Sequence, residues 1–121
     1  MGGNDRMAMG SVCHVEIPAP DLAALRGFYG GVFGWTFSEM GPQYVLFHAG
    51  DGGGGLDASA PVVDGGVVLV LAVEDIDASL TAITGAGGEA LSPKTGIGGD
   101  HGFCAYFRDP CGNKMGIWSR S

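Results

Sequence analysis

Two stretches of the chain, 54 positions apart, follow the same outline. Residues 14–22 (HVEIPAPDL) and residues 68–76 (VLVLAVEDI) each run as an extended segment into an aspartate and a branched apolar residue. An aspartate at such a boundary typically caps a helix, because its carboxylate accepts hydrogen bonds from the free N–H groups of the first turn. Asp21 matches Asp75 at this offset. A repeated strand–helix unit predicts two modules that bury their faces against each other.

Hydrophobic periodicity gives both modules the element order βαβββ. In the first module the expected elements are a strand at 12–17, a helix at 21–33, strands at 35–40 and 44–48, a glycine turn at 51–55 and a brief strand near Leu56. In the second they are a strand at 67–73, a helix at 75–84, a strand at 89–91, a glycine-containing loop at 92–99, and strands at 103–108 and 114–118. The strand at 67–73 is continuously apolar, so a central place in its sheet is expected.

The length of 121 residues fits one domain. That domain is expected at residues 11–119, after a loose tail at residues 1–10, with modules at about 11–60 and 66–119. Hydrophobic residues make up 45% of the chain and charged residues only 16%, which is typical of a folded rather than a disordered protein. We therefore expect an α+β fold in which two tandem βαβββ modules form cup-shaped mixed sheets around a cavity.

Charge and cysteine content restrict the partners and the compartment. A net charge of −7 argues against nucleic acid and anionic membrane surfaces as partners. The three cysteines, Cys13, Cys104 and Cys111, are odd in number and lack paired-motif spacing, which favours a reducing compartment. The sequence shows neither an apolar run long enough to span a membrane nor a signal-peptide pattern. A cytoplasmic protein is expected.

Several short motifs resemble those of one known superfamily when their order and spacing are taken together. They are residues 14–22, 28–29 (FY), 33–35 (FGW), 86–88 (AGG), 92–93 (SP) and 107–113 (FRDPCGN). In this arrangement the chain resembles the vicinal oxygen chelate superfamily, which includes glyoxalase I, bleomycin-resistance proteins and extradiol dioxygenases. The resemblance implies two cups around a cavity for a small molecule, usually in a homodimer, and in many members a divalent metal.

The same resemblance identifies four positions that could hold a metal. His14 occupies the first-strand position, whereas its counterpart in the second module is Val68. The last-strand position of the second module falls on Gly116, and an offset of 60 places its counterpart at Leu56, with Asp57 adjacent. Because a catalytic divalent site normally needs about three protein ligands, His14 alone cannot hold a metal. No cofactor is expected; the alternative is a rearranged divalent site made of His14, Glu16 and Asp57.

His14 and Glu16 are the strongest candidates for a functional pair. The period of two in a strand turns both side chains to one face. If that face lines the cavity, the pair could bind a polar ligand or act as general acid and base. The alternative is a polar strand face that is simply solvated.

Other polar candidates lie at strand ends and in loops. His48 and Arg108 occupy matching strand ends, where they either frame the cavity mouth or are solvated, and His101 follows the long glycine-containing loop. Cys104 and Cys111 lack a neighbouring histidine in sequence, so packing is favoured over a nucleophilic role. Six aromatic residues are enough to line a pocket for a flat apolar ligand, although most of them are expected in the core: Trp35, Tyr44, Phe47, Phe103, Tyr106 and Trp118. Of these, Trp35, Phe103 and Trp118 are the expected ligand contacts.

These observations predict a metal-free protein that binds a small molecule, with His14 and Glu16 as polar anchors. The alternative is a metal-dependent lyase, isomerase or dioxygenase of the glyoxalase type. A third possibility is an accessory domain that acts through its dimer surface. A fold alone does not decide among these functions.

Overall fold

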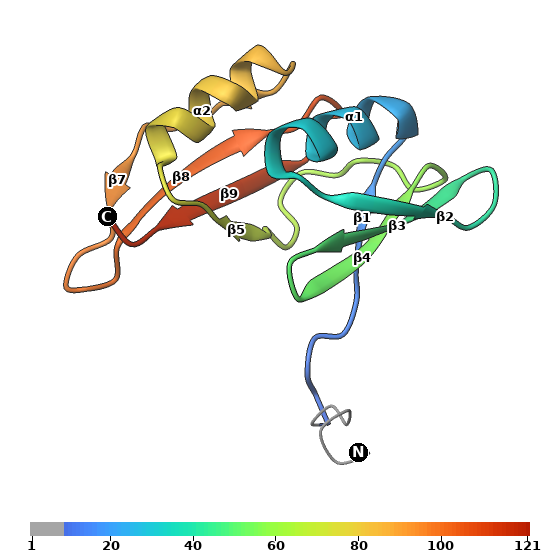
Figure 1. The fold of residues 1–121 in the computed structure, drawn as a ribbon, viewed down its shortest axis with the longest axis horizontal. Helices are drawn as coiled ribbons and strands as arrows, with labels where there is room; N and C mark the ends of the chain where they lie inside the picture. Colours follow the sequence, from blue (N-terminus) through green and yellow to red (C-terminus); the bar gives the residue numbers. More distant parts are fainter. Residues whose placement is uncertain (1–8) are drawn as a thin grey trace.

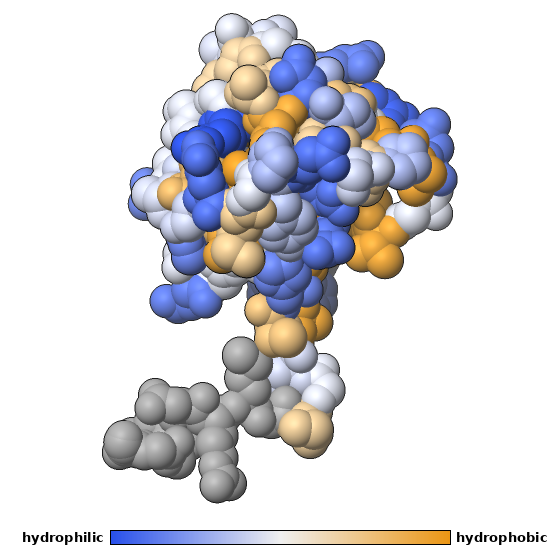
Figure 2. Space-filling view, turned by 90° about the vertical axis from the view of Figure 1, so that its right-hand side faces the viewer, coloured by the Kyte–Doolittle hydropathy of each residue, from blue (hydrophilic) through white to orange (hydrophobic). Residues whose placement is uncertain are grey.

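The structure is a computed structural model that describes residues 9–121, so most of the expected tail at residues 1–10 lies outside the described residues. Two sheets lie side by side, and both helices cover the same side of them (Figure 1). The predicted α+β architecture with two tandem modules is confirmed. Hydrophilic and hydrophobic residues are interspersed on the molecular face shown in Figure 2.

The first module forms a four-stranded mixed sheet with the order β1-β4-β3-β2. Its elements are β1 (Val15–Pro18), α1 (Leu22–Phe33), β2 (Thr36–Glu39), β3 (Tyr44–Ala49) and β4 (Gly52–Asp57). Strand β1 pairs in parallel with β4, which therefore lies between β1 and β3. The expected glycine turn at 51–55 is thus wrong for most of its length, because residues 52–55 are the first four of the six residues of an inner strand.

The second module repeats this order with one addition. Its elements are β5 (Val70–Ala72), α2 (Ile76–Gly85), β6 (Glu89–Ala90), β7 (Thr95–Gly96), β8 (Phe103–Arg108) and β9 (Lys114–Ser119). The sheet order is β5-β9-β8-β6, and β7, which falls inside the expected loop at 92–99, also pairs with β8.

Strand β5 corrects one expectation. It lies at the edge of its sheet, pairs only with β9, and leaves Val70 52% exposed. A run of apolar residues indicates that a strand is buried. It does not show whether the strand is an inner strand or an edge strand that packs against another module. The predicted central place was therefore wrong.

Both helices begin at the predicted aspartates. The Asp21 carboxylate accepts from the Ala24 N–H at 3.1 Å, and the Asp75 carboxylate accepts from the Ala78 N–H at 3.0 Å. Helix α1 ends at Gly34, whose φ of 72° is in the left-handed region that glycine adopts without a steric penalty. The local capping signals therefore fix the start of both helices and the end of the first.

One core joins the two modules. Leu25, Phe28 and Tyr29 of α1 pack in the same cluster as Ile83 of α2 and Phe107 of β8. A stack of rings extends this core, with ring centroids 4.4 Å apart for Tyr29–Trp35 and 4.3 Å apart for Trp35–Phe47. Burial of this apolar surface holds the open faces of the two sheets in a fixed relation.

Two glycines, Gly31 inside α1 and Gly34 at its C-terminal end, offer a simple test of the helix assignment. A Cβ at Gly31 would meet open space, so Gly31→Ala should stabilise the protein by about 0.5–1 kcal/mol, measured by denaturant unfolding. Gly34→Ala should have the opposite sign, because an alanine at this left-handed φ is strained. Equal effects from the two substitutions would contradict the assigned helix end.

Candidate functional site

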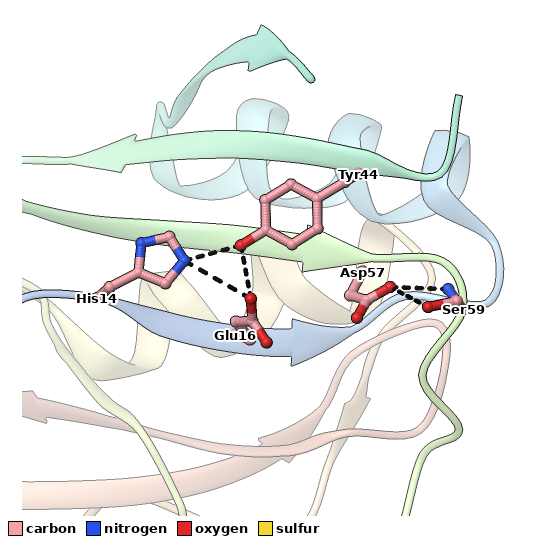
Figure 3. A network of polar contacts seen from close by, with 5 residues as sticks. All are labelled: His14, Glu16, Tyr44, Asp57 and Ser59. Carbon is pink, nitrogen blue, oxygen red and sulfur yellow. Dashed lines mark hydrogen bonds and ion pairs between the residues drawn. The ribbon is translucent and has the colours of Figure 1, made fainter. Parts of the chain in front are cut away.

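A cluster of three polar side chains lies on the open face of the first sheet, opposite the helices. His14 projects from the segment just before β1 and Glu16 from β1 itself. Tyr44 reaches both of them from β3 (Figure 3). The Tyr44 hydroxyl donates to Glu16 Oε2 at 2.9 Å and lies 2.7 Å from His14 Nε2. Since the phenol has one proton, His14 Nε2–H is the donor to Tyr44 in this arrangement. The expected placement of His14 and Glu16 on one face agrees with this geometry.

Tyr44 can reach β1 only because the strand between them carries a glycine. Gly55 of β4 pairs with Glu16 on one side and with Leu46 on the other. A Cβ at Gly55 would overlap the Tyr44 hydroxyl and ring. The glycine thus lets the Tyr44 side chain cross β4 and contact His14 and Glu16, which precede Tyr44 by about 30 positions in sequence.

The environment of Tyr44 keeps its hydroxyl protonated. Desolvation, the hydrogen bond to Glu16 and the negative charge of that carboxylate together raise the pKa of Tyr44 to about 12. Asp57, the cross-strand partner of Tyr44, adds to the same effect, while its own pKa is lowered by hydrogen bonds from the Ser59 side chain and backbone. The cluster therefore offers a protonated phenol beside the side chains of His14 and Glu16.

The cluster borders a cleft of about 720 Å³ between the two modules. One wall is residues 14–18, which include His14 and Glu16. The other walls come from the connecting segment 63–69 and from Arg108 and residues 113–115 of the second module. A cleft of this size fits a small organic molecule.

The second sheet repeats the crossing of an aromatic ring over a glycine. Tyr106 of β8 pairs with Gly116 of β9, and a Cβ at Gly116 would press on the Tyr106 ring. Matching Gly116 to its first-module counterpart by register selects Gly55, which pairs with Leu46 as Gly116 pairs with Tyr106. The expected counterpart Leu56 is wrong, because Leu56 points into the core and is fully buried. Gly55 follows its partner Leu46 by nine positions, whereas Gly116 follows Tyr106 by ten, so the offset between the modules increases from 60 to 61 within this hairpin.

The remaining predicted residues are dispersed. His48 is exposed on the same sheet face as Tyr44, and His101 is exposed in the loop before β8, where its carbonyl accepts from the Trp118 indole at 2.7 Å. Trp118 lies on the open face of the second sheet. The structure brings none of the three into the His14–Tyr44–Glu16 cluster, so their contact with a ligand stays a prediction.

Two of the predicted aromatic contacts face the helices instead of the cleft. Trp35 is 7% exposed and stacks between Tyr29 and Phe47, although it also borders a second hollow of about 560 Å³. Phe103 packs against the core from β8, with the Lys94 ammonium 4.6 Å from its ring centroid. Strand alternation places Phe103 on the face opposite Trp118, which explains the difference.

Sequence reasoning missed the polar role of Tyr44. The available signal was the glycine run at residues 52–55, which reads as a turn but serves as a strand that a neighbouring side chain crosses. Recognition of that role requires the sheet order, which places β4 between β1 and β3.

The cysteines show no sign of activation. Cys111 is half-buried in the turn before β9, and burial raises the pKa of its thiol, which disfavours the thiolate needed for nucleophilic attack. Cys13 is exposed and Cys104 is half-buried, and neither forms a disulfide within residues 9–121.

The metal positions implied by the resemblance do not form a ligand set. His14 has an imidazole, but Val68, Gly55 and Gly116 have no side-chain donor atom. Within the described part of the chain, no group of three or more His, Cys, Asp or Glu side chains lies close enough to hold a metal ion. Nor does any helix there have the length and apolar character needed to cross a membrane.

Comparisons with known proteins fit this architecture. The chain is 30% identical over 114 residues to CFP32 of Mycobacterium tuberculosis, a protein named as a proposed glyoxylase, covering 86% of this chain and 43% of that protein. It is 27% identical over 138 residues to the anthracycline biosynthesis protein DnrV of Streptomyces peucetius, covering 95% of this chain and 49% of that protein. The chain thus spans less than half the length of these two relatives.

A solved structure shows the same fold at low sequence identity. A mutant of the fosfomycin resistance protein FosX from Listeria monocytogenes, in complex with Mn(II) and a dihydroxypropylphosphonic acid, superposes with a TM-score of 0.78. The identity is 13%, and the match covers 94% of this chain and 93% of that one. Residues 11–117 also match the sequence profile of the glyoxalase/bleomycin resistance protein/dioxygenase superfamily. The chain therefore belongs to the glyoxalase/bleomycin resistance protein/dioxygenase superfamily.

Proposed function

We propose that this protein binds a small organic molecule in the cleft between its two modules, with His14 and Glu16 of the cleft wall as hydrogen-bonding anchors and Tyr44 holding both in position. The observation that carries the proposal is the bridge formed by the Tyr44 hydroxyl between His14 and Glu16 at the cleft wall. The bridge holds three groups of different hydrogen-bonding character in one place. Polar groups that converge on a cleft with apolar wall residues such as Val15, Val63 and Val67 are the usual signature of a ligand site.

The proposed binding does not depend on a metal at the four positions implied by the family. Three of those positions lack donor atoms in this chain, so the ligand would be held by hydrogen bonds and apolar contact. The partly exposed imidazole and carboxylate, 39% and 58% exposed, are accessible from the cleft. We propose a homodimer as the assembly, as the resemblance implies.

An anthracycline is the first probe, because DnrV is named for anthracycline biosynthesis and the cleft size suits a polycyclic ligand with hydroxyl groups. Fluorescence titration should show saturable binding to the wild type. Tyr44→Phe should weaken binding about fivefold, in line with the loss of one hydrogen bond, and His14→Ala should weaken it by a similar factor. Tyr106→Phe is the matched control, because Tyr106 also packs over a glycine of its sheet but makes no hydrogen bond to His14 or Glu16.

A metal-dependent enzyme of the glyoxalase type is the second candidate, favoured by the retained His14 and by the Mn(II) in the FosX structure. Elemental analysis of purified protein after exposure to Mn²⁺, Ni²⁺ and Zn²⁺ separates the two candidates. Our proposal expects metal far below one ion per chain. One tightly held ion per chain, lost in His14→Ala, would establish the second candidate instead.

A further inference from the structure

Two basic side chains face each other directly on the wall of the cleft. Arg108, the last residue of β8, is the cross-strand partner of Lys114, the first residue of β9, and both line the cleft. Like charges at directly opposed strand positions repel each other and destabilise the sheet. The chain has only 6 Lys and Arg residues against 13 Asp and Glu residues, so this pairing does not follow from a generally basic composition.

Few groups of the protein itself neutralise these two positive charges. Arg108 Nη1 forms an ion pair with Asp64 at 3.1 Å and donates to the Gly112 carbonyl at 3.0 Å. Asp64 is 83% exposed and belongs to the segment between the modules, so the pair contributes little to stability. Lys114 lies 4.9 Å from the Tyr106 ring centroid, and within residues 9–121 no carboxylate lies within ion-pair distance of it.

Arg108 has unused hydrogen-bonding capacity toward the cleft. Both of its contacts use Nη1, whereas a guanidinium carries five N–H donors in a planar fork. That fork matches the two oxygens of a carboxylate or phosphate group, and a neighbouring ammonium adds a second positive charge. The pair thus has the hydrogen-bonding groups and the charge that an anion-binding site requires.

We propose that Arg108 and Lys114 form a subsite for the carboxylate or phosphate group of a small organic anion, with Asp64 as an internal counter-ion that the ligand displaces. This inference rests on the proposed function, because it assigns the second polar end of the same cleft. His14 and Glu16 line the β1 wall, Arg108 and Lys114 line the β8–β9 wall, and the apolar Val63 and Val67 border the same space. The ligand would carry an anionic group, an apolar body and an uncharged hydrogen-bonding end.

Isothermal titration calorimetry at low ionic strength tests the subsite with two probes, benzoate for a carboxylate and phenyl phosphate for a phosphate. Benzyl alcohol is the uncharged control. At least one anion should bind more tightly than benzyl alcohol, and the tighter of the two identifies the anionic group. Lys114→Gln and Arg108→Gln should each weaken that binding about tenfold, as expected for a charge-assisted hydrogen bond.

Asp64→Asn gives the most specific result. Removal of the competing carboxylate should strengthen anion binding about threefold, whereas a general loss of structure would weaken it. Lys94→Gln is the matched control, because Lys94 contacts Phe103 and does not line the cleft; it should bind the anion like the wild type. Anion binding that is equal in all variants, or no binding of either anion, would overturn the inference, and weaker binding by Asp64→Asn would overturn the counter-ion role.

The two proposals fail in different ways. Anthracycline binding that depends on Tyr44, combined with no anion binding, would leave the proposed function standing and remove the subsite. Anion binding that depends on Lys114, combined with anthracycline binding that is indifferent to Tyr44 and His14, would establish the subsite and remove the proposed anchors.

Discussion

Asp109→Ala should destabilise the protein by about 3–5 kcal/mol, because it removes the acceptor of a buried hydrogen-bond network. The Asp109 carboxylate is 3% exposed and accepts from the Tyr29 hydroxyl at 2.8 Å and from the Asn113 side-chain amide at 2.8 Å. It also accepts from the backbone N–H groups of Cys111 and Asn113, both at 3.0 Å. Denaturant unfolding should show the loss as a lower transition midpoint.

This network also joins the two modules, which adds a consequence for the site. Tyr29 belongs to α1, and the Asn113 amide donates to the Pro18 carbonyl at the end of β1, 2.8 Å away. The turn of the second module thereby holds the strand that carries Glu16. Weakening of the network should therefore lower ligand affinity as well as stability.

Two variants control the Asp109 prediction. Asp100→Ala removes an exposed carboxylate and should change the free energy of unfolding by less than about 0.5 kcal/mol. Tyr29→Phe deletes one donor and should cost about 1 kcal/mol. A stability of Asp109→Ala within about 1 kcal/mol of the wild type would contradict the role assigned to the network.

Gly54→Ala should cost about 3 kcal/mol, the second large effect that we expect. Gly54 of β4 pairs with Val15 of β1, and a Cβ at Gly54 would overlap the Val15 carbonyl oxygen. Because this obstacle is backbone, the parallel pairing of β1 and β4 must open to admit the methyl group. Unfolding by denaturant measures the loss, and an unchanged midpoint would contradict the assigned register.

Gly55→Ala, one position along, should separate stability from binding. Its Cβ would overlap the Tyr44 hydroxyl, which is the far end of a side chain that can rotate away. We therefore expect a cost near 1 kcal/mol in stability, but a loss of anthracycline affinity at least as large as that of Tyr44→Phe. Gly55→Ala that binds like the wild type would show that the bridge over β4 does not matter for the ligand.

Much of the fold could be predicted because its signals are local. The helix caps at Asp21 and Asp75 depend on a carboxylate and an N–H three residues later, and both are present. The common face of His14 and Glu16 follows from the alternation of side chains along a strand. These features depend only on a few consecutive residues, so they can be predicted without knowledge of the tertiary contacts.

Other features of the candidate site arise from contacts between distant segments. Gly54 and Gly55 look like turn residues in sequence, and their strand role is imposed by the close approach of Val15 and Tyr44. The place of Arg108 and Lys114 on the same cleft as His14 likewise depends on how the second module lies against β1. Neither arrangement leaves a periodic pattern in the sequence.

The sequence by itself determined the repeated strand–helix plan, the caps and the shared face of His14 and Glu16, because capping and alternation act over a few residues. Only the tertiary structure decided that Tyr44 joins them, that β5 lies at a sheet edge, and that the Asp109 turn supports β1. The physical reason is that sheet order and register determine where two strands approach so closely that only glycine fits. They also determine which buried polar atoms lie within hydrogen-bonding distance of each other. Those contacts join residues roughly 30 to 95 positions apart, as the bonds of Tyr44 to His14 and of Asn113 to Pro18 show.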